Sequence, residues 1–178
     1  MSDDSLLGSM DLRHSRIEGT GVFAAHSISR GDTVLRIDDS RGVDEHHPLG
    51  SAEDPRYCDY LEAGKVILIQ IPETYINYSC DPNTYVKTMN GVREVIALRP
   101  IEAGQEITYD YCINGDGNTV WVCHCGASRC RRMIHSDFFH LPMELQSEYL
   151  PPLDDWFRQE RAAEVEWLAR GGDTQDSP

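Results

Sequence analysis

The sequence lacks any long hydrophobic segment and any recognisable secretion signal. No apolar run among the 178 residues approaches the roughly 20 that a membrane-spanning helix needs. The N-terminal stretch MSDDSLLGSM is acidic, whereas a secretory signal has a basic region followed by an apolar one. We therefore expect a soluble intracellular protein, cytoplasmic or nuclear, of one domain with tails and without membrane association.

Basic residues are also scarce. The chain has 16 Lys and Arg against 30 Asp and Glu, which gives a formal net charge of −14. Because phosphate contacts need clustered Lys and Arg, this balance argues against direct binding to nucleic acid. It is compatible with a basic lysine-containing protein or peptide as partner, steered by the long-range field. An acidic surface that only keeps the protein soluble explains the charge equally well.

A disulfide framework is not expected, because six cysteines without a secretion signal favour thiols or metal ligands. Three of them form a C-x-C-x4-C cluster near the end of the chain, and a fourth lies far upstream in NYSCDPN. Four thiolates favour one tetrahedral Zn2+ and leave no open position, so the site is expected to be structural. The expected ligands are Cys80, Cys123, Cys125 and Cys130. Cys58 and Cys112 stand apart and are expected to be small core residues.

Short segments separated by turns predict a mainly β domain without alternating helices. KVILIQI is apolar and β-branched, as is typical of a buried strand, and VREVIALRP predicts another. Two further strands are expected on either side of SRGD, and one more after the turn in IEAGQ. Residues 38–56 are polar and rich in Pro and Gly, which predicts a surface loop with at most one helical turn.

The C-terminal region has a helical pattern instead. LPPLDD breaks the chain, and Asp154 or Asp155 can cap a helix that runs to Arg170 and ends at a pair of glycines. On a helical wheel, Trp156, Ala163 and Trp167 share one face, with Phe157 and Leu168 beside them, which predicts packing on the domain or on a partner. The protein is therefore expected to be a monomer or a dimer formed through this helix. The final GGDTQDSP is expected to be disordered.

A Gly-Thr-Gly bend at residues 19–21 could bring backbone close to a ligand, because glycine carries no side chain. The third glycine and the following helix of a dinucleotide-binding fingerprint are both missing. The bend alone is therefore weak evidence for any particular ligand.

Four motifs in this order make a specific pattern: GTGVFA, NYSCDPN, VIALRPIEAGQEITYDY and CHCGASRC. Over residues 12–133 the chain resembles the SET-domain protein lysine methyltransferases that carry a cysteine-rich post-SET tail. The resemblance implies a β-clip fold of small β-sheets, in which NYSC is threaded beneath a loop near YDY as a pseudoknot, followed by the C-terminal α-helix. The implied organisation is an N-terminal tail (1–11), SET domain (12–115), post-SET zinc segment (116–133), helical extension (134–171) and disordered tail (172–178).

The resemblance also implies methyl transfer from S-adenosylmethionine to a lysine side chain of a protein, such as a basic histone-like target. Tyr111 matches the family's catalytic tyrosine, and Tyr109 matches a position that is Tyr or Phe in the family. A hydroxyl at Tyr109 restricts the room around the amine, which favours monomethylation. Without the flanking motifs, both residues would be interpreted as ordinary strand aromatics.

Cofactor contacts carried over from the family fall on Thr20, Gly21, Asn77 and Tyr78. Tyr78 departs from the histidine usual at its position, although its backbone contacts are kept and its ring can pack on adenine. The connection before Asn77 is short, only PETYI, and lacks the family's usual Asn and Arg-Phe. Asn83 is expected to stabilise the threaded loop.

Several alternatives stay open. Tyr57 and Tyr60 are candidates for a channel wall and equally for core packing. Trp121 is expected to cover the cofactor or the lysine channel, or to pack on the surface. A catalytically inactive module that binds a peptide is the main rival to the enzyme, and methylation of another amine is a third reading; the two tyrosines Tyr109 and Tyr111 favour the enzyme.

Overall fold

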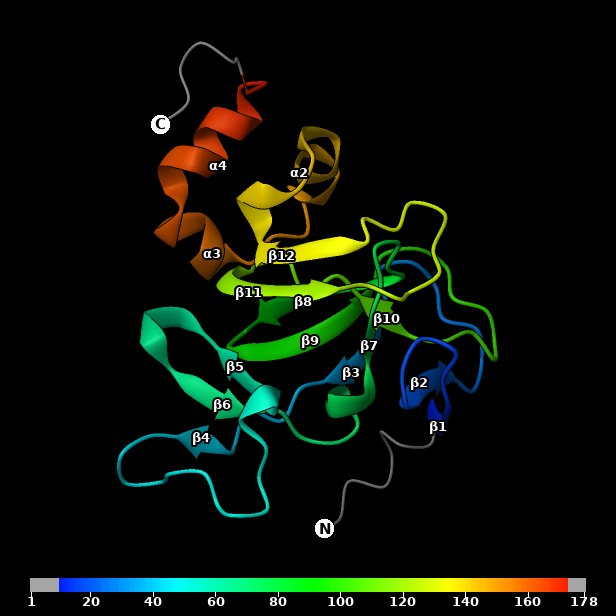
Figure 1. The fold of residues 1–178 in the computed structure, drawn as a ribbon. Helices are drawn as coiled ribbons and strands as arrows, with labels where there is room; N and C mark the ends of the chain where they lie inside the picture. Colours follow the sequence, from blue (N-terminus) through cyan, green and yellow to red (C-terminus); the bar gives the residue numbers. More distant parts are fainter. Residues whose placement is uncertain (1–9, 173–178) are drawn as a thin grey trace.

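The computed structural model describes residues 10–172, and the expected N-terminal tail (1–11) and disordered C-terminal tail (172–178) lie largely outside this range. It contains four small β-sheets, with helices gathered after the last strand (Figure 1). Within residues 10–172, no helix is long and apolar enough to cross a membrane. The mainly β fold class predicted from the sequence is confirmed.

The central sheet has five strands in the order β3-β9-β8-β10-β7. Strand β10 runs parallel to both β7 and β8, while the other pairs are antiparallel. Strands β8 and β9 form a hairpin whose Asn90 and Gly91 both have positive φ, as a two-residue turn between twisted strands requires. The five strands are β3 (Thr33–Arg36), β7 (Asn77–Tyr78), β8 (Thr84–Met89), β9 (Val92–Ala97) and β10 (Thr108–Tyr109).

Three smaller sheets surround the central one, and they include strands that the sequence did not predict. The first β-strand and a short strand within the expected loop 38–56 are both additions to the prediction. The sheets are the hairpin β1 (Met10–His14) with β2 (Thr20–Ala24), the sheet β4 (Gly42–Val43), β6 (Val66–Leu68) and β5 (Cys58–Tyr60), and the hairpin β11 (Asp116–Val122) with β12 (Met133–Asp137). Single 3-10 turns are η1 (Pro55–Tyr57), η2 (Glu62–Gly64), η3 (Glu73–Tyr75) and η4 (Phe138–His140).

The segment NYSCDPN is clamped against the β10 segment by hydrogen bonds. Asn83 donates from Nδ2 to the Glu106 carbonyl oxygen (2.8 Å) and accepts at Oδ1 from the Thr108 N–H (2.9 Å). The Ser79 N–H donates to the Tyr109 carbonyl oxygen at 3.1 Å. The prediction that Asn83 stabilises this loop is confirmed, because its side-chain amide hydrogen-bonds to the backbone of both Glu106 and Thr108.

The C-terminal extension differs from the single helix predicted. It contains α2 (Met143–Tyr149), which was not predicted, and then α3 (Asp155–Glu160) and α4 (Ala162–Ala169). Arg161, with φ −113° and ψ 36°, breaks the expected helix in two. The buried side chains of the two helices are Phe157, Val165 and Leu168. Of the predicted face, Trp156 and Trp167 are partly buried against the same hydrophobic cluster, whereas Ala163 is exposed. The predicted face is therefore confirmed except at Ala163.

The helices pack on the rest of the chain through one hydrophobic cluster. Phe157, Val165 and Leu168 share it with Ile134 of β12 and with Tyr78 of the central sheet. The hairpin β11–β12 lies between this sheet and the helices (Figure 1). The buried helical face is thus used within the chain, which favours packing on the domain over a dimer contact.

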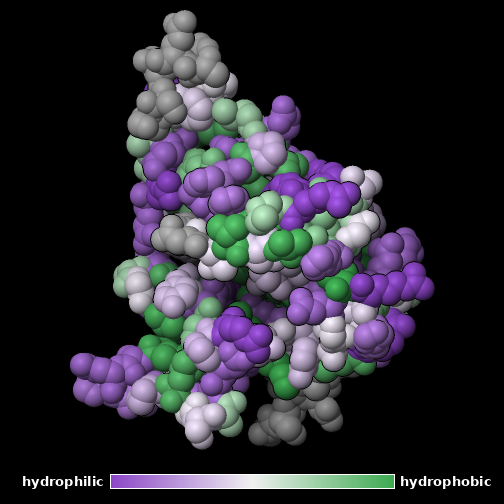
Figure 2. Space-filling view, in the orientation of Figure 1, coloured by the Kyte–Doolittle hydropathy of each residue, from purple (hydrophilic) through white to green (hydrophobic). Residues whose placement is uncertain are grey.

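The outer face of the β11–β12 hairpin is apolar. Val120, Val122 and Met133 are all more than half exposed. Figure 2 shows hydrophobic side chains gathered over these two strands among hydrophilic ones. This hairpin therefore has an exposed hydrophobic surface next to the cavity described below.

Candidate active site and metal centre

The structure brings the four predicted cysteine ligands together. Their Sγ atoms all lie within 4.8 Å of one another, and the Sγ atoms of Cys80 and Cys123 are 3.8 Å apart. All six cysteines of the chain are free. A tetrahedral zinc site with Zn–S bonds of about 2.3 Å needs sulfur atoms about 3.8 Å apart. The four-cysteine donor set therefore fits Zn2+ in both chemistry and spacing.

Backbone N–H groups point at the sulfur atoms, as expected where thiolate charge must be stabilised. The N–H of Arg131 donates to Cys80 Sγ at 3.3 Å, and the N–H of Cys80 donates to Cys125 Sγ at 3.5 Å. Cys80 follows β7, whereas the other three ligands come from the connection between β11 and β12. The cluster therefore fastens the β11–β12 hairpin to the central sheet.

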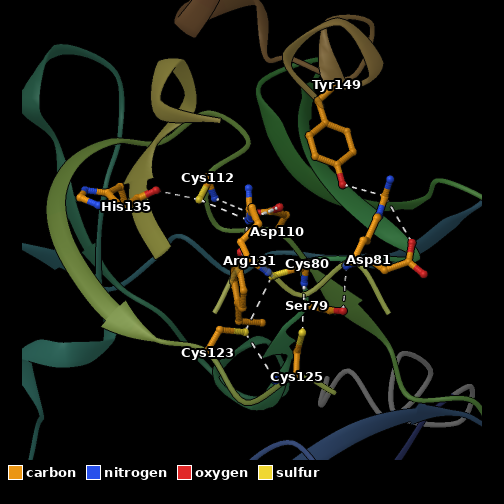
Figure 3. A network of polar contacts seen from close by, with 12 residues as sticks. Ser79, Cys80, Asp81, Asp110, Cys112, Cys123, Cys125, Arg131, His135 and Tyr149 are labelled. Carbon is orange, nitrogen blue, oxygen red and sulfur yellow. Dashed lines mark hydrogen bonds and ion pairs between the residues drawn. The ribbon is translucent and has the colours of Figure 1, made fainter. Parts of the chain in front are cut away.

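A buried ion pair reinforces this attachment (Figure 3). Arg131 Nη2 pairs with Asp110 Oδ2 at 2.6 Å and also donates to the Tyr78 hydroxyl. Asp110 is fully buried, so its charge depends on this partner. Cys112 Sγ donates to the His135 carbonyl oxygen at 3.0 Å, and Cys112 is fully buried, as predicted for a core residue. Burial, followed by the charge of Asp110, raises the pKa of the Cys112 thiol.

Beneath the β11–β12 hairpin lies a cavity of about 370 Å3. It is lined by side chains from β5, η3, the β10 segment and β11. Five aromatic residues of the sequence prediction lie on its wall or beside it: Tyr57, Tyr60, Tyr109, Tyr111 and Trp121. Tyr57 and Tyr60 are 40% and 68% exposed, so the core-packing alternative for them is wrong. Cys58 also lines the cavity and is half-buried rather than a core residue.

Tyr109 and Tyr111 form an aromatic pair on the cavity wall. Their ring centroids are 4.6 Å apart, and the Tyr111 hydroxyl donates to the Ile76 carbonyl oxygen at 2.7 Å. Tyr111 is 38% exposed. Burial is the main cause that raises the pKa of both phenols. Both hydroxyls are therefore neutral at physiological pH and can donate hydrogen bonds.

Tyr78 faces the interior rather than an open surface. Only 7% of it is exposed, and its ring meets Tyr111 and Trp121 edge to face with centroid distances of 5.2 Å. Its hydroxyl lies 3.6 Å from Cys80 Sγ. Burial, followed by the charge of Asp110, raises the pKa of Tyr78. The residue thus joins the cysteine cluster to the cavity, and its side chain is already occupied by protein contacts.

Thr20, Gly21 and Asn77 come together around the carboxylate of Glu106, which the sequence analysis did not single out. Asn77 Nδ2 donates to Glu106 Oε1 at 2.8 Å and to the Thr20 carbonyl oxygen at 3.3 Å. A Cβ atom at Gly21 would clash with Glu106 Oε1, so a larger residue there would have to displace this carboxylate. The only sequence signal for Glu106 was its place in the strand motif, which does not show which way the carboxylate points.

Glu73 is a second acid that the sequence analysis missed. It lies in η3, within PETYI, lines the cavity and is only 5% exposed. Neither carboxylate oxygen has a hydrogen-bond partner among the described residues. Burial raises the pKa of Glu73 to about 8; the charge of Arg93 opposes this shift, and those of Asp59 and Asp39 add to it. In the sequence, Glu73 is a single acidic residue in the short connection PETYI, and nothing there indicates that it is buried.

The comparisons with known proteins agree with the geometry. The SET domain family model matches residues 19–112. Human histone-lysine N-methyltransferase 2B is 39% identical over 137 residues, which cover 68% of this chain and 5% of that protein. Histone-lysine N-methyltransferase Set2 of Drosophila melanogaster is 28% identical over 130 residues, covering 66% of this chain and 6% of that protein.

A comparison with a solved structure also supports the fold. The structure of KRYPTONITE in complex with mCHG DNA and SAH has a TM-score of 0.52 and 22% sequence identity, and covers 70% of this chain and 28% of that one. The curated relatives are much longer than this protein, since the chain spans at most 13% of the length of those compared. Because the family model matches more than half of its residues, the chain belongs to the SET-domain family.

Proposed function

We propose that this protein is an S-adenosylmethionine-dependent protein-lysine N-methyltransferase. The observation that carries the proposal is the hydrogen bond from the Tyr111 hydroxyl to the Ile76 carbonyl oxygen. Tyr111 lines the cavity, and Ile76 directly precedes Asn77, which contacts Thr20 at the glycine bend. Tyr111 therefore lies at the boundary between a cavity that suits a lysine side chain and a region that suits the methyl donor.

The chemistry asks the chain mainly to position two reactants. S-adenosylmethionine supplies a methyl group on a sulfonium, and a lysine must meet it as an uncharged amine. Alignment of the two supplies roughly 7–11 kcal/mol of the barrier. The Tyr109 hydroxyl can donate a hydrogen bond to the neutral amine, and the Tyr111 oxygen, whose proton goes to Ile76, can accept one from it. Neither phenol adds a negative charge that would hold the amine as an ammonium ion. Thr20, Gly21, Asn77 and the backbone of Tyr78 are the proposed cofactor-binding residues.

The proposed substrate is a basic protein, and histone tails are the first choice. Several relatives are named histone-lysine N-methyltransferases. The formal net charge of −14 attracts a cationic peptide at long range. Such a target places the reaction in the cytoplasm or nucleus. The proposed structural Zn2+, held by the four clustered cysteines, keeps β11 and Trp121 over the cavity.

Replacing Tyr111 by Phe is expected to slow methyl transfer by about 100-fold or more, because a hydrogen bond at the reacting centre is lost. The measurement is transfer of a radiolabelled methyl group from S-adenosylmethionine to histone tails. Tyr85→Phe, on β8 outside the cavity, is the matched control and should keep wild-type activity. Tight peptide binding by a wild-type protein that transfers no methyl group would instead favour the inactive binding module.

Replacing Tyr109 by Phe is expected to shift the product from monomethyllysine to higher methylation states. The hydroxyl of Tyr109 is buried beside Tyr111, and its removal frees room around the amine. Mass spectrometry of a lysine peptide after exhaustive reaction measures the product distribution. An unchanged distribution would show that another residue sets the product.

A further inference from the structure

Glu73 is a buried acid that the fold leaves without a hydrogen-bond partner. It is 5% exposed, and neither Oε1 nor Oε2 bonds to any described residue. An uncompensated buried carboxylate destabilises a protein, because its desolvation is not offset. Glu73 also lines the cavity that contains Tyr109 and Tyr111. A buried carboxylate that has no partner among the described residues and lines this cavity therefore points to a ligand.

Arg93, the cation whose charge acts on Glu73, does not satisfy it, because Arg93 is paired with two other acids. Arg93 Nη2 pairs with Asp39 Oδ1 at 2.8 Å, and Arg93 Nη1 pairs with Asp59 Oδ2 at 2.7 Å. These three residues are the charged groups that act on Glu73. With Glu73 ionised, the group has three negative charges and one positive charge. The part of the cavity lined by Glu73, Asp59 and Arg93 therefore favours a further cation.

Tyr109 and Tyr111 line the same cavity as Glu73 but do not supply its missing hydrogen-bond donor. Tyr109 and Tyr111 are both affected by the charge of Glu73, and both stay protonated at physiological pH. Neither phenol donates to Glu73, whose two oxygens have no partner among the described residues, and the Tyr111 hydroxyl donates to Ile76 instead. The missing partner is therefore a donor that enters from the open side of the cavity.

We propose that Glu73 receives the substrate ammonium group and accepts a proton from it. An N–H bond of the ammonium breaks, an O–H bond forms on the Glu73 carboxylate, and the electron pair stays on nitrogen. The neutral amine then forms its N–C bond while the methyl carbon leaves the sulfonium sulfur, which keeps the bonding pair. The product is a methylammonium, and Glu73 returns its proton to water. The role of Glu73 as proton acceptor rests on the proposed function.

The acidity of Glu73 suits this role. Its pKa of about 8 lies between that of an ordinary carboxyl and that of a lysine ammonium. Proton transfer is most effective when the pKa of the acceptor lies close to the working pH. An approaching cation lowers the pKa of Glu73 and so ionises the acid when the substrate arrives.

The first test needs no catalysis and uses n-butylammonium as a mimic of the lysine side chain. Infrared difference spectra between wild type and Glu73→Gln report the protonated carboxyl of Glu73. Its titration midpoint is expected near 8 and should fall by about 1–3 units with n-butylammonium. Neutral n-butanol should leave it unchanged. A midpoint near 4.5, or one that n-butylammonium does not move, overturns the proposal.

The second test compares pH–rate profiles for methyl transfer to histone tails. Glu73→Gln is expected to slow the reaction about 100-fold near neutral pH, and its rate should rise steadily as alkali deprotonates the lysine.

Two further variants serve as comparisons. Glu73→Asp should restore part of the rate. Glu62 is exposed and lies outside the cavity, so Glu62→Gln should match wild type. A Glu73→Gln profile parallel to that of wild type overturns the proposal. If the wild type transfers no methyl group, the proposed function fails, and the infrared midpoints alone decide whether Glu73 receives a cation.

Discussion

Removing the proposed Zn2+ is expected to release the β11–β12 hairpin from the central sheet and to abolish methyl transfer. The four cysteines are free, lie within 4.8 Å of one another and join two distant parts of the chain. Binding of structural zinc by such sites is worth roughly 10 kcal/mol or more, which is comparable with the whole stability of a domain. Elemental analysis should find one zinc per chain, and a chelator should lower the melting temperature sharply.

Cys80→Ser is the sharper form of this experiment, because it removes the one ligand that comes from the central sheet. The variant should lose most of its zinc and shift the fluorescence of Trp121, whose ring packs on Tyr78. Cys58→Ser is the matched control, since Cys58 lies outside the cluster and should leave the zinc content unchanged. A Cys80→Ser protein with full zinc content would show that the distant ligand does not bind the metal.

The metal cluster is also the part of the site that could be predicted best. Cysteines in C-x-C-x4-C spacing are close in the chain, so their proximity follows from local geometry alone. Cys80 was added from its motif, and the structure places its sulfur 3.8 Å from that of Cys123. The strands formed by KVILIQI and VREVIALRP were predictable for a similar reason, because β-branched apolar runs favour a buried strand in many contexts.

The residues that were missed depend on contacts between distant segments. Glu73 and Glu106 are single acids in short segments, and only the folded chain shows that one lacks a partner and the other gathers Asn77 and Ser15. The helical wheel assumed one continuous helix, whereas the chain breaks at Arg161, and after the break Val165 is buried and Ala163 is exposed. Local pattern predicts elements well but does not place a side chain against a segment far away in sequence.

Tyr78 shows how the departure from the family pattern changes the site. Its hydroxyl contacts Cys80 and Arg131, while its ring contacts Tyr111 and Trp121. One side chain therefore links the metal cluster, the buried ion pair and the cavity wall. If the cysteine cluster loosens, the ring of Tyr78 is expected to shift against Tyr111, the proposed catalytic tyrosine. Loss of the metal should therefore also abolish methyl transfer.

Replacing Glu73 by Gln is expected to make the protein more stable than wild type in alkali. Burial raises the pKa of Glu73 from 4.5 to about 8, so the folded state holds a proton that the unfolded state has lost. Stability from this proton is fully present below about pH 4.5 and is lost as the pH rises to about 8. At about 1.4 kcal/mol for each pKa unit, the loss is at most roughly 5 kcal/mol. The Gln side chain does not titrate, so the variant does not lose this stability as the pH rises.

The measurement is the free energy of unfolding in urea for both proteins at several pH values across this window. The difference between the two proteins matters, because every other titrating group, including Arg93, Asp59 and Asp39, is common to both. Glu62→Gln removes an exposed acid and should follow wild type at every pH. A constant difference between Glu73→Gln and wild type would mean that Glu73 titrates alike in the folded and unfolded states. That result would remove the raised pKa on which proton acceptance by Glu73 relies, whereas a difference that widens toward about pH 8 would support it without any assay of methyl transfer.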